Sequence, residues 1–333
     1  MKSRRWMAIA GIVSLALILG FMGTAIAQEK KAPKVIAIGS GPVGGGFNMI
    51  VMGLSKYWEK DLGITGQVVP ATPKDSLLRF QAGRLDVFIS PSSWYNAAWK
   101  GEEKMGFKDP IKDVRIMFHI YSNPFYVITL KKSGIKNISD LKGKRVGSGP
   151  AQDTWEKIIG DKFEANGLKF FGDNPDFKKT WANYSDMARM LGDGTLDACV
   201  AMYEGLTPQP ATQQLMQEQE LRAVEWDPAI FKKFEGAYFP PAVIKKELLP
   251  FLEKDHRCFE GGVAAFACGA KVDEKLIYDL TKSMHKNLNQ LASENPFWKY
   301  PIKYPEIITA DYGVPYHPGA VKYWKEAGLW KGK

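Results

Sequence analysis

The sequence predicts an α/β protein made of two lobes of similar plan. The phrase Gly83-Arg84-Leu85-Asp86-Val87-Phe88 is echoed 111 positions later by Gly194-Thr195-Leu196-Asp197-Ala198-Cys199. Each copy follows a helical stretch that begins on an acid, Asp75 or Asp186, so helix, glycine stop and short buried strand occur once per half. Chance similarity of two short phrases is the alternative. A chain of 333 residues has room for two lobes, and the cleft between lobes is where small ligands bind.

The first residues have the pattern of a secretory signal. A charged start, Lys2 to Arg5, precedes the apolar stretch 7–22, and Ala25-Ile26-Ala27 is a suitable cleavage site. We expect cleavage after Ala27 and a mature protein in the periplasm. An uncleaved membrane anchor is the alternative, but the apolar stretch is short for a span.

Charge and cysteine content narrow the function classes. The formal net charge is +9, and removing the three basic residues of the signal leaves +6. The basic residues are scattered among acids without an arginine-rich arm, so a nucleic-acid partner is poorly supported. Cys199 is expected to be a buried free thiol, while Cys258 and Cys268 form either one disulfide or two buried thiols. No Cys or His spacing suggests a metal, and we expect no cofactor.

The first half alternates strands and helices. Short apolar runs predict strands at 35–38, 67–69 and 85–89. The glycine-rich loop 39–46 leads into a helix, a second helix begins at Asp75, and Ser90 to Ser93 cap a third. Two strands, 114–120 and 125–130, are predicted with a break at Asn123-Pro124.

The second half repeats the alternation. A turn leads into a strand at 141–147, residues 148–154 cap a helix that runs to Gly167, and the second echo ends in the strand 196–202. A helix, a strand at 221–226, an irregular crossing at 238–241 and an apolar run at 263–268 follow. One amphipathic helix is predicted from Asp273 to about Ala292, and the tail from Tyr300 is expected to wrap the first lobe.

Four segments that end strands or begin helices form the candidate site. Ligands of open α/β sheets bind outside the carboxyl ends of the strands, which would bring these segments to one cleft. Backbone N–H groups of 45–48 and the hydroxyls of Ser92, Ser93 and Thr154 would bind a carboxylate, with aromatic walls from Trp94, Trp155 and Tyr203. Each residue is also typical of a helix cap. The candidate ligand-binding residues are Gly44, Gly45, Gly46, Phe47, Asn48, Ser90, Ser92, Ser93, Trp94, Ser148, Gln152, Asp153, Thr154, Trp155, Tyr203, Glu204 and Thr207.

Enzymatic interpretations find little support. Gly39, Gly41 and Gly44 match the letters of a dinucleotide fingerprint, but no acid ends a second strand in the usual place. The serines at 90–93 lack a G-x-S-x-G elbow. Asp86 and Asp197 stand at strand starts, where pairing with the backbone is the expected role. The sequence therefore predicts a binding protein and not an enzyme.

Several motifs occur in a distinctive order along the mature chain. They are Ile38-Gly39-Ser40-Gly41-Pro42-Val43-Gly44-Gly45-Gly46, Leu141-Lys142-Gly143-Lys144-Arg145-Val146, Asp193-Gly194-Thr195-Leu196-Asp197-Ala198, His317-Pro318-Gly319-Ala320 and Tyr323-Trp324-Lys325-Glu326-Ala327-Gly328-Leu329. In order and spacing the chain resembles the TAXI-type solute-binding proteins of TRAP transporters, over essentially its whole mature length.

The resemblance implies a type II periplasmic-binding fold, with two lobes, strand crossovers and a ligand cleft between them. Lobe I would comprise 28–124 and 258–333, and lobe II 125–257, with hinges near Asn123-Pro124 and residue 258. It also implies delivery of a small organic anion, of the dicarboxylate or acidic amino acid class, to TRAP-type membrane permease subunits. We expect a monomer. The alternatives are a periplasmic ligand-sensing protein for a membrane sensor kinase and a secreted enzyme on the same fold.

The chain departs from the resembled pattern at the expected pocket. Phe47-Asn48-Met49, Pro150-Ala151-Gln152-Asp153 and Tyr203-Glu204 stand where smaller residues are usual. An acid facing the pocket, Asp153 or Glu204, would repel a dicarboxylate or pair with an amino group.

Overall fold

The computed structural model describes residues 34–41, 45–149 and 153–331. The residues from Lys34 onward form one compact unit. The predicted signal segment lies outside the described residues and stays a prediction. No helix in the described part of the chain is long and apolar enough to cross a membrane.

The first strand group consists of β1 (Val35–Ser40), β2 (Thr65–Pro70) and β3 (Val87–Pro91). Both β2 and β3 run parallel to β1, in the order β2-β1-β3. The connections are α2 (Gly46–Leu62) and α3 (Pro73–Gln81), and α4 (Ser92–Lys100) follows β3. Parallel strands need such helical crossovers because the chain must return to the same end of the sheet.

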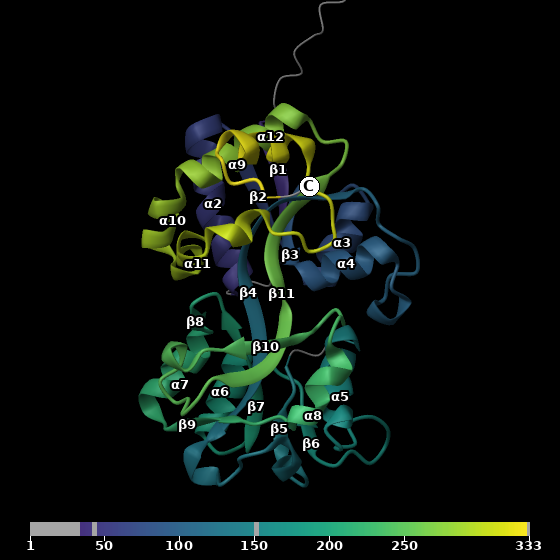
Figure 1. Ribbon diagram of the computed structural model, residues 1–333, viewed down its shortest axis with the longest axis vertical. Coiled ribbons are helices and arrows are strands. Elements are labelled where there is room, and N and C mark those ends of the chain that lie inside the picture. The colour runs from purple at the N-terminus through teal and green to yellow at the C-terminus, as the bar shows by residue number, and fades with distance from the viewer. Residues whose placement is uncertain (1–33, 42–44, 150–152, 332–333) are drawn as a thin grey trace, which may run out of the picture. The chain divides into compact units, whose positions relative to one another are not determined.

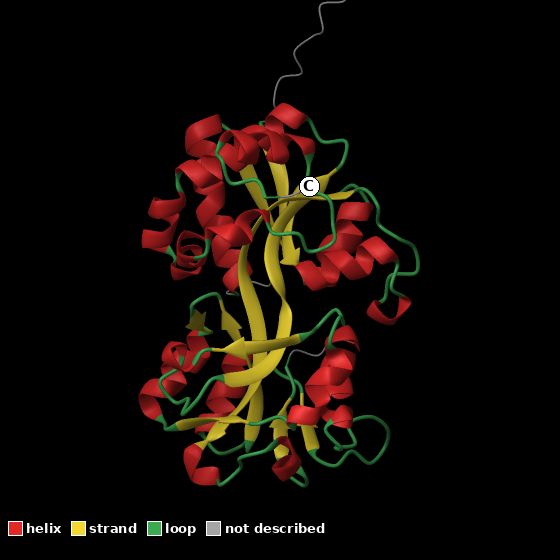
Figure 2. Ribbon diagram, in the orientation of Figure 1, coloured by secondary structure: helices red, strands yellow, loops and turns green. Residues whose placement is uncertain are grey.

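The second strand group has the same plan. It consists of β5 (Arg145–Gly147), β6 (Lys178–Thr180) and β7 (Ala198–Glu204), parallel and in the order β6-β5-β7. Here α5 (Asp153–Ala165) and α6 (Tyr184–Gly192) make the crossovers. Figure 2 shows helices flanking the strands of both groups.

The two echoed phrases form the same local structure and the same hydrogen bond in the two strand groups. Asp86 and Asp197 each accept a hydrogen bond from a backbone N–H of the adjacent parallel strand, at Ala37 (2.8 Å) and Arg145 (2.7 Å). Gly83 and Gly194 precede these strands with φ of +69° and +73°, a conformation that favours glycine. The expectation that both acids pair structurally is confirmed.

Two long antiparallel strands, β4 (Val114–Leu130) and β11 (His256–Gly269), join the groups. β11 pairs with β3 of the first group, and β4 pairs with β7 of the second (Figure 1). This strand order confirms the predicted α/β class, with two lobes of similar plan and strand crossovers.

The predicted break at Asn123-Pro124 is wrong, because β4 is continuous through it. Proline lacks an N–H, but pairing of β4 with β7 begins only at Phe125, so no donor is required there. On the other side, the register between β4 and β11 shifts between Glu260 and Val263. This shift is a β-bulge, which lets β11 stay paired with β4 although the register changes beside Pro124.

The remaining strands and α-helices extend this frame. In chain order they are β8 (Thr207–Pro208), α7 (Pro210–Glu218), β9 (Leu221–Val224), α8 (Pro228–Phe231), β10 (Pro241–Ile244), α9 (Glu274–Lys286), α10 (Leu288–Glu294), α11 (Lys299–Lys303) and α12 (Pro318–Glu326). The single helix predicted from Asp273 to Ala292 is in fact α9 and α10. They are separated at Asn287, whose side-chain amide donates to Asp61 (2.7 Å) and to the Ser283 carbonyl (2.8 Å).

The tail packs against β4, as the indole of Trp324 shows. Trp324 is fully buried, and its Nε1–H donates to the Met117 carbonyl at 2.9 Å. Trp58 of α2 is likewise buried and donates to the Leu280 carbonyl of α9 at 3.0 Å. Buried tryptophans usually find such a partner, and these two bonds tie α12 to β4 and α2 to α9.

All three cysteines are buried free thiols. Cys258 and Cys268 lie ten residues apart on the single strand β11, and a strand rises about 3.3 Å per residue. The two sulfurs are therefore far beyond the reach of a disulfide. Of the two alternatives, the buried thiols are right, and Cys199 is a buried free thiol as expected.

Candidate functional site

The first candidate segment is the start of α2. Gly45 is the N-cap and makes no side-chain cap, and the first turn of α2 holds no acid. The buried Asn48 donates from Nδ2 to the Ser40 hydroxyl at 3.0 Å, which ties this turn to the end of β1. Phe47 packs beside Gly41, where a β-carbon would lie 2.8 Å from that of Phe47. Gly44 lies outside the described residues.

The second segment, at the end of β3, is occupied with internal contacts. The Ser92 hydroxyl accepts from the Val263 N–H at 2.9 Å, and Ser93 donates to the Gly261 carbonyl at 2.9 Å. Trp94 is buried against Phe107, with ring centroids 6.4 Å apart. These three side chains therefore fasten α4 to β11 and to the core, while the buried Ser90 hydroxyl has no partner among the described residues.

The third segment lies at the end of β5. Ser148 is fully buried, its N–H donates to the Thr180 carbonyl at 2.9 Å, and its hydroxyl has no partner in the described part of the chain. Asp153, Thr154 and Trp155 begin α5. Their side chains, and Gln152 altogether, lie outside what the structure describes.

The fourth segment ends β7. Glu204 pairs with Thr207 across a short antiparallel turn, and Gln209 Nε2 donates to Glu204 Oε1 at 3.3 Å. The Thr207 hydroxyl donates to the Glu204 carbonyl at 3.5 Å. Tyr203 is buried, and its hydroxyl lacks a described partner.

The first and fourth segments meet. A β-carbon placed on Gly46 would lie 2.6 Å from Glu204 Oε2 and 3.1 Å from Phe297 Cε2. A side chain at position 46 would displace the carboxylate, so the glycine allows this close approach. The end of β7, in the second strand group, thus touches the start of α2, the helix that connects β1 to β2 in the first group.

Burial dominates the electrostatics of this contact. Glu204 is 8% exposed, and its Oε2 has no hydrogen-bond partner among the described residues. Loss of solvent raises the pKa of Glu204 to about 7, and the hydrogen bond from Gln209 opposes this only in part. The neighbouring Tyr121 hydroxyl is also buried and without a described partner, and burial raises its pKa well above the usual range.

A second carboxylate, Glu260 of β11, lies close by and was not predicted. It accepts hydrogen bonds from the Ser122 hydroxyl and from the N–H groups of Asn123 and Gly262, the last two at 2.9 Å. Burial still raises the pKa of Glu260 above its ordinary range. In the sequence, Glu260 stands three residues before the predicted apolar run 263–268, and an acid so close to a buried strand is the signal that could have found it.

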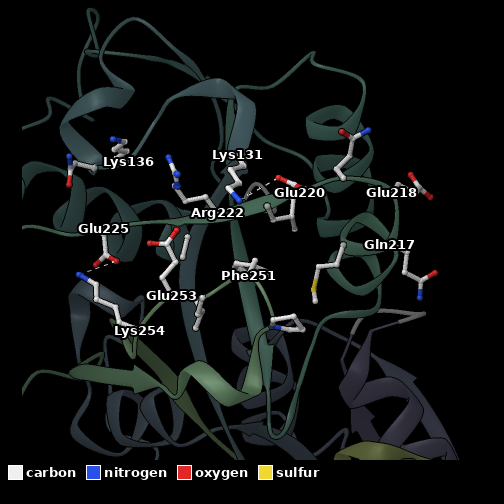
Figure 3. Close-up of a pocket in the computed structure, with 17 residues that line it drawn as sticks. Lys131, Lys136, Gln217, Glu218, Glu220, Arg222, Glu225, Phe251, Glu253 and Lys254 are labelled. Atoms are coloured by element: carbon white, nitrogen blue, oxygen red, sulfur yellow. Dashed lines mark ion pairs between the residues drawn. The ribbon is translucent and has the colours of Figure 1, made fainter.

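A hollow elsewhere contains none of the predicted residues. It has a volume of about 850 Å³ and is lined by residues of β9 and of the loop 250–254, among others. Figure 3 shows its charged side chains, among which Lys131 pairs with Glu220 (3.5 Å) and Lys254 with Glu225 (3.6 Å). Exposed, mutually paired charges of this kind are typical of a solvated surface. No group of acids, histidines and cysteines in the described ranges is placed to hold a metal.

Comparisons with known proteins add a family and structural likenesses. The NMT1-like family matches residues 38–328. A Xanthomonas citri protein solved with bound ATP is 11% identical, with a TM-score of 0.49, and 89% of this chain and 97% of that chain are covered. The periplasmic aliphatic sulphonate binding protein of Escherichia coli is 14% identical, with a TM-score of 0.44 and coverage of 91% and 90%. An amino acid ABC transporter substrate-binding protein of Streptococcus pneumoniae, bound to L-arginine, is 14% identical, with a TM-score of 0.43 and coverage of 81% and 96%.

Proposed function

The chain belongs to the NMT1-like family, and we propose that it is a periplasmic solute-binding receptor rather than an enzyme. The observation that carries the proposal is the contact between Gly46 and Glu204. This contact brings the end of β7, in the second strand group, against the start of α2, in the first strand group. Binding a small ligand between two such parts, at the ends of their strands, is the general use of this architecture.

We place the division between the lobes on the two joining strands. Lobe I would be residues 28–124 with 258–333, and lobe II residues 125–257. Each joining strand changes its geometry near these limits: β4 carries Pro124, and β11 has a register shift between Glu260 and Val263. A proline that cannot donate a hydrogen bond and a bulge both weaken the ladder locally, which suits a hinge between lobes.

The solute would be a small organic acid or amino acid. Its carboxylate would lie at the start of α2, where the first-turn N–H groups and the helix dipole favour an anion. The candidate residues retained for this role are Gly45 to Asn48 of the first lobe and Ser148, Thr154 and Tyr203 to Thr207 of the second. The hydroxyls of Ser92 and Ser93 are less available to a solute, because they already bond Val263 and Gly261.

Export and delivery complete the proposal. The signal pattern in residues 1–27 supports secretion across the inner membrane with cleavage after Ala27. The resemblance to TAXI-type proteins supports delivery of the solute to the membrane subunits of a TRAP-type permease.

A thermal-shift screen of organic acids and amino acids tests this function. A solute at 100 times its Kd stabilises the folded protein by about 2.7 kcal/mol, enough to move the melting temperature by several degrees. X-ray scattering with the best solute should then show a more compact particle than without it. Absence of any stabilising solute, or scattering curves that do not change on saturation, would contradict a hinged receptor.

A further inference from the structure

The buried carboxylate of Glu204 has no cationic side chain paired with it among the described residues. Its Oε2 is buried beside Gly46, and only Gln209, a neutral donor, hydrogen-bonds the other oxygen. The start of α2 supplies a partial charge of about half an elementary unit, without a hydrogen bond to Oε2. A buried carboxylate is costly unless a cation or several donors compensate it.

In the described part of the chain, the surroundings of Glu204 supply no cation to compensate it. Ser122 lies between the two acids: its hydroxyl donates to Glu260, and its carbonyl accepts from the N–H of Gly205, the residue after Glu204, at 3.0 Å. Within the described residues, no ion pair joins either carboxylate to a lysine, arginine or histidine. This local deficit of cations occurs in a chain with a formal net charge of +9.

Aromatic rings complete the environment. Tyr121 stacks on Phe297 with centroids 5.6 Å apart, and Phe47 lies 6.3 Å from Tyr121. The β-carbon position of Gly46 lies against both Phe297 and Glu204. Aromatic faces attract ammonium groups, most strongly where water is excluded.

We propose that Glu204 binds the protonated amino group of the solute, so that the receptor selects amino acids over the corresponding acids without an amine. The inference rests on the proposed function and narrows its ligand class. An ammonium group supplies the missing counter-charge, whereas a second carboxylate at the same place would be repelled. The α-carboxylate would remain at the start of α2.

The competing arrangement is a neutral Glu204 that donates its proton to a ligand carboxylate. The two differ in the protons exchanged at pH 7, near the pKa of about 7 that burial gives this group. Pairing with an ammonium ionises Glu204 and releases a proton, while donation to a carboxylate takes one up. The facing groups Tyr121, Tyr184 and Tyr203 have pKa values raised by burial and keep their protons at this pH.

Calorimetry on the mature protein with matched pairs of probes is the test. The pairs are L-glutamate with glutarate, L-aspartate with succinate and L-leucine with 4-methylpentanoate, titrated at pH 7 in phosphate and in Tris buffer. In the pair that binds, we expect the amine-bearing member to bind about 30-fold tighter or more, the scale of one hydrogen bond to a charged group. The buffer comparison should show proton release. Glu204→Gln should abolish the preference, and the exposed Glu247→Gln should leave it unchanged.

Each outcome decides the matter. Equal affinities within the binding pair, tighter binding of the member without the amine, or proton uptake would overturn the inference and leave the receptor function standing. These are measurements on the wild-type protein, so they hold even if Glu204→Gln fails to fold. If neither these probes nor the wider solute screen gives binding, the receptor function itself fails.

Discussion

The stability of the ligand-free protein should depend on pH through Glu204. Burial raises the pKa of this carboxyl from 4.5 to about 7 in the folded protein. An acid with a raised pKa in the folded state contributes stability below its unfolded pKa and loses it as the pH rises through the folded value. Between about pH 4.5 and pH 7 the loss amounts to about 3 kcal/mol of unfolding free energy, at about 1.4 kcal/mol for each pH unit of difference.

Glu204→Gln isolates this contribution, because glutamine keeps the shape and cannot ionise. Urea unfolding of the wild type and the variant at pH 5, 6, 7 and 8 gives the difference between their unfolding free energies. The titration of all other groups is common to both proteins and cancels in this difference. We expect the difference to move in favour of the variant by about 2–3 kcal/mol between pH 5 and pH 8. The exposed Glu247→Gln should show no such trend. A difference for Glu204→Gln that is constant over this range would refute the buried, uncompensated carboxylate.

Three further outcomes follow from the packing. Gly46→Ala should destabilise the protein by about 1–3 kcal/mol, because its β-carbon would lie 2.6 Å from Glu204 Oε2. Gly53→Ala in the same helix meets open space and should stabilise the protein by up to about 1 kcal/mol. Chemical denaturation measures both variants, and equal effects would be inconsistent with the contact. Alkylation in denaturant without reductant should label all three cysteines, and mass spectrometry that finds only one label would reveal the disulfide that the structure excludes. Asp86→Ala should cost about 1 kcal/mol through the lost bond to the Ala37 N–H, and a loss no larger than that of Asp109→Ala, an exposed control, would deny the role shared by the echoed phrases.

A local feature could be predicted from the sequence where the backbone conformation at a position favours one type of residue. The glycines at 83 and 194 need a left-handed backbone, and the acids that follow bond the neighbouring strand. The glycine requirement is local, and each acid stands at the same place after its glycine although its partner strand lies about 50 positions earlier. The repeated plan of the two halves could therefore be predicted from the phrases alone.

Features that depend on distant partners were missed. Pro124 was predicted to break a strand. The strand that pairs with β4 from Phe125 onward is β7, which lies far away in the chain, so the sequence near Pro124 does not show this pairing. Asn287 divides a continuous apolar pattern by bonding Asp61, which no periodicity shows.

The candidate site shows the same division. The positions at which α2 and α4 begin could be predicted, but the expected serine cap of α4 is wrong, because its N-cap is Pro91 and no side chain caps it. Ser92 and Ser93 bond Val263 and Gly261 of β11 instead, about 170 positions away. Tyr121 and Glu260 were missed, because both lie just outside the predicted strands and the sequence gives no sign of which groups surround them. Glu204 was predicted as a site residue, and its loss of solvent became visible only in the fold.

Hydrogen exchange with and without the bound solute tests the central claim most directly. If the solute binds between the two halves, protection should increase at both the start of α2, residues 45–48, and the end of β7, residues 203–207. Peptides from the surface hollow around Lys131, Arg222 and Lys254 should be unchanged. Protection confined to one of the two segments, or appearing at the hollow instead, would contradict a receptor that holds its solute between two lobes.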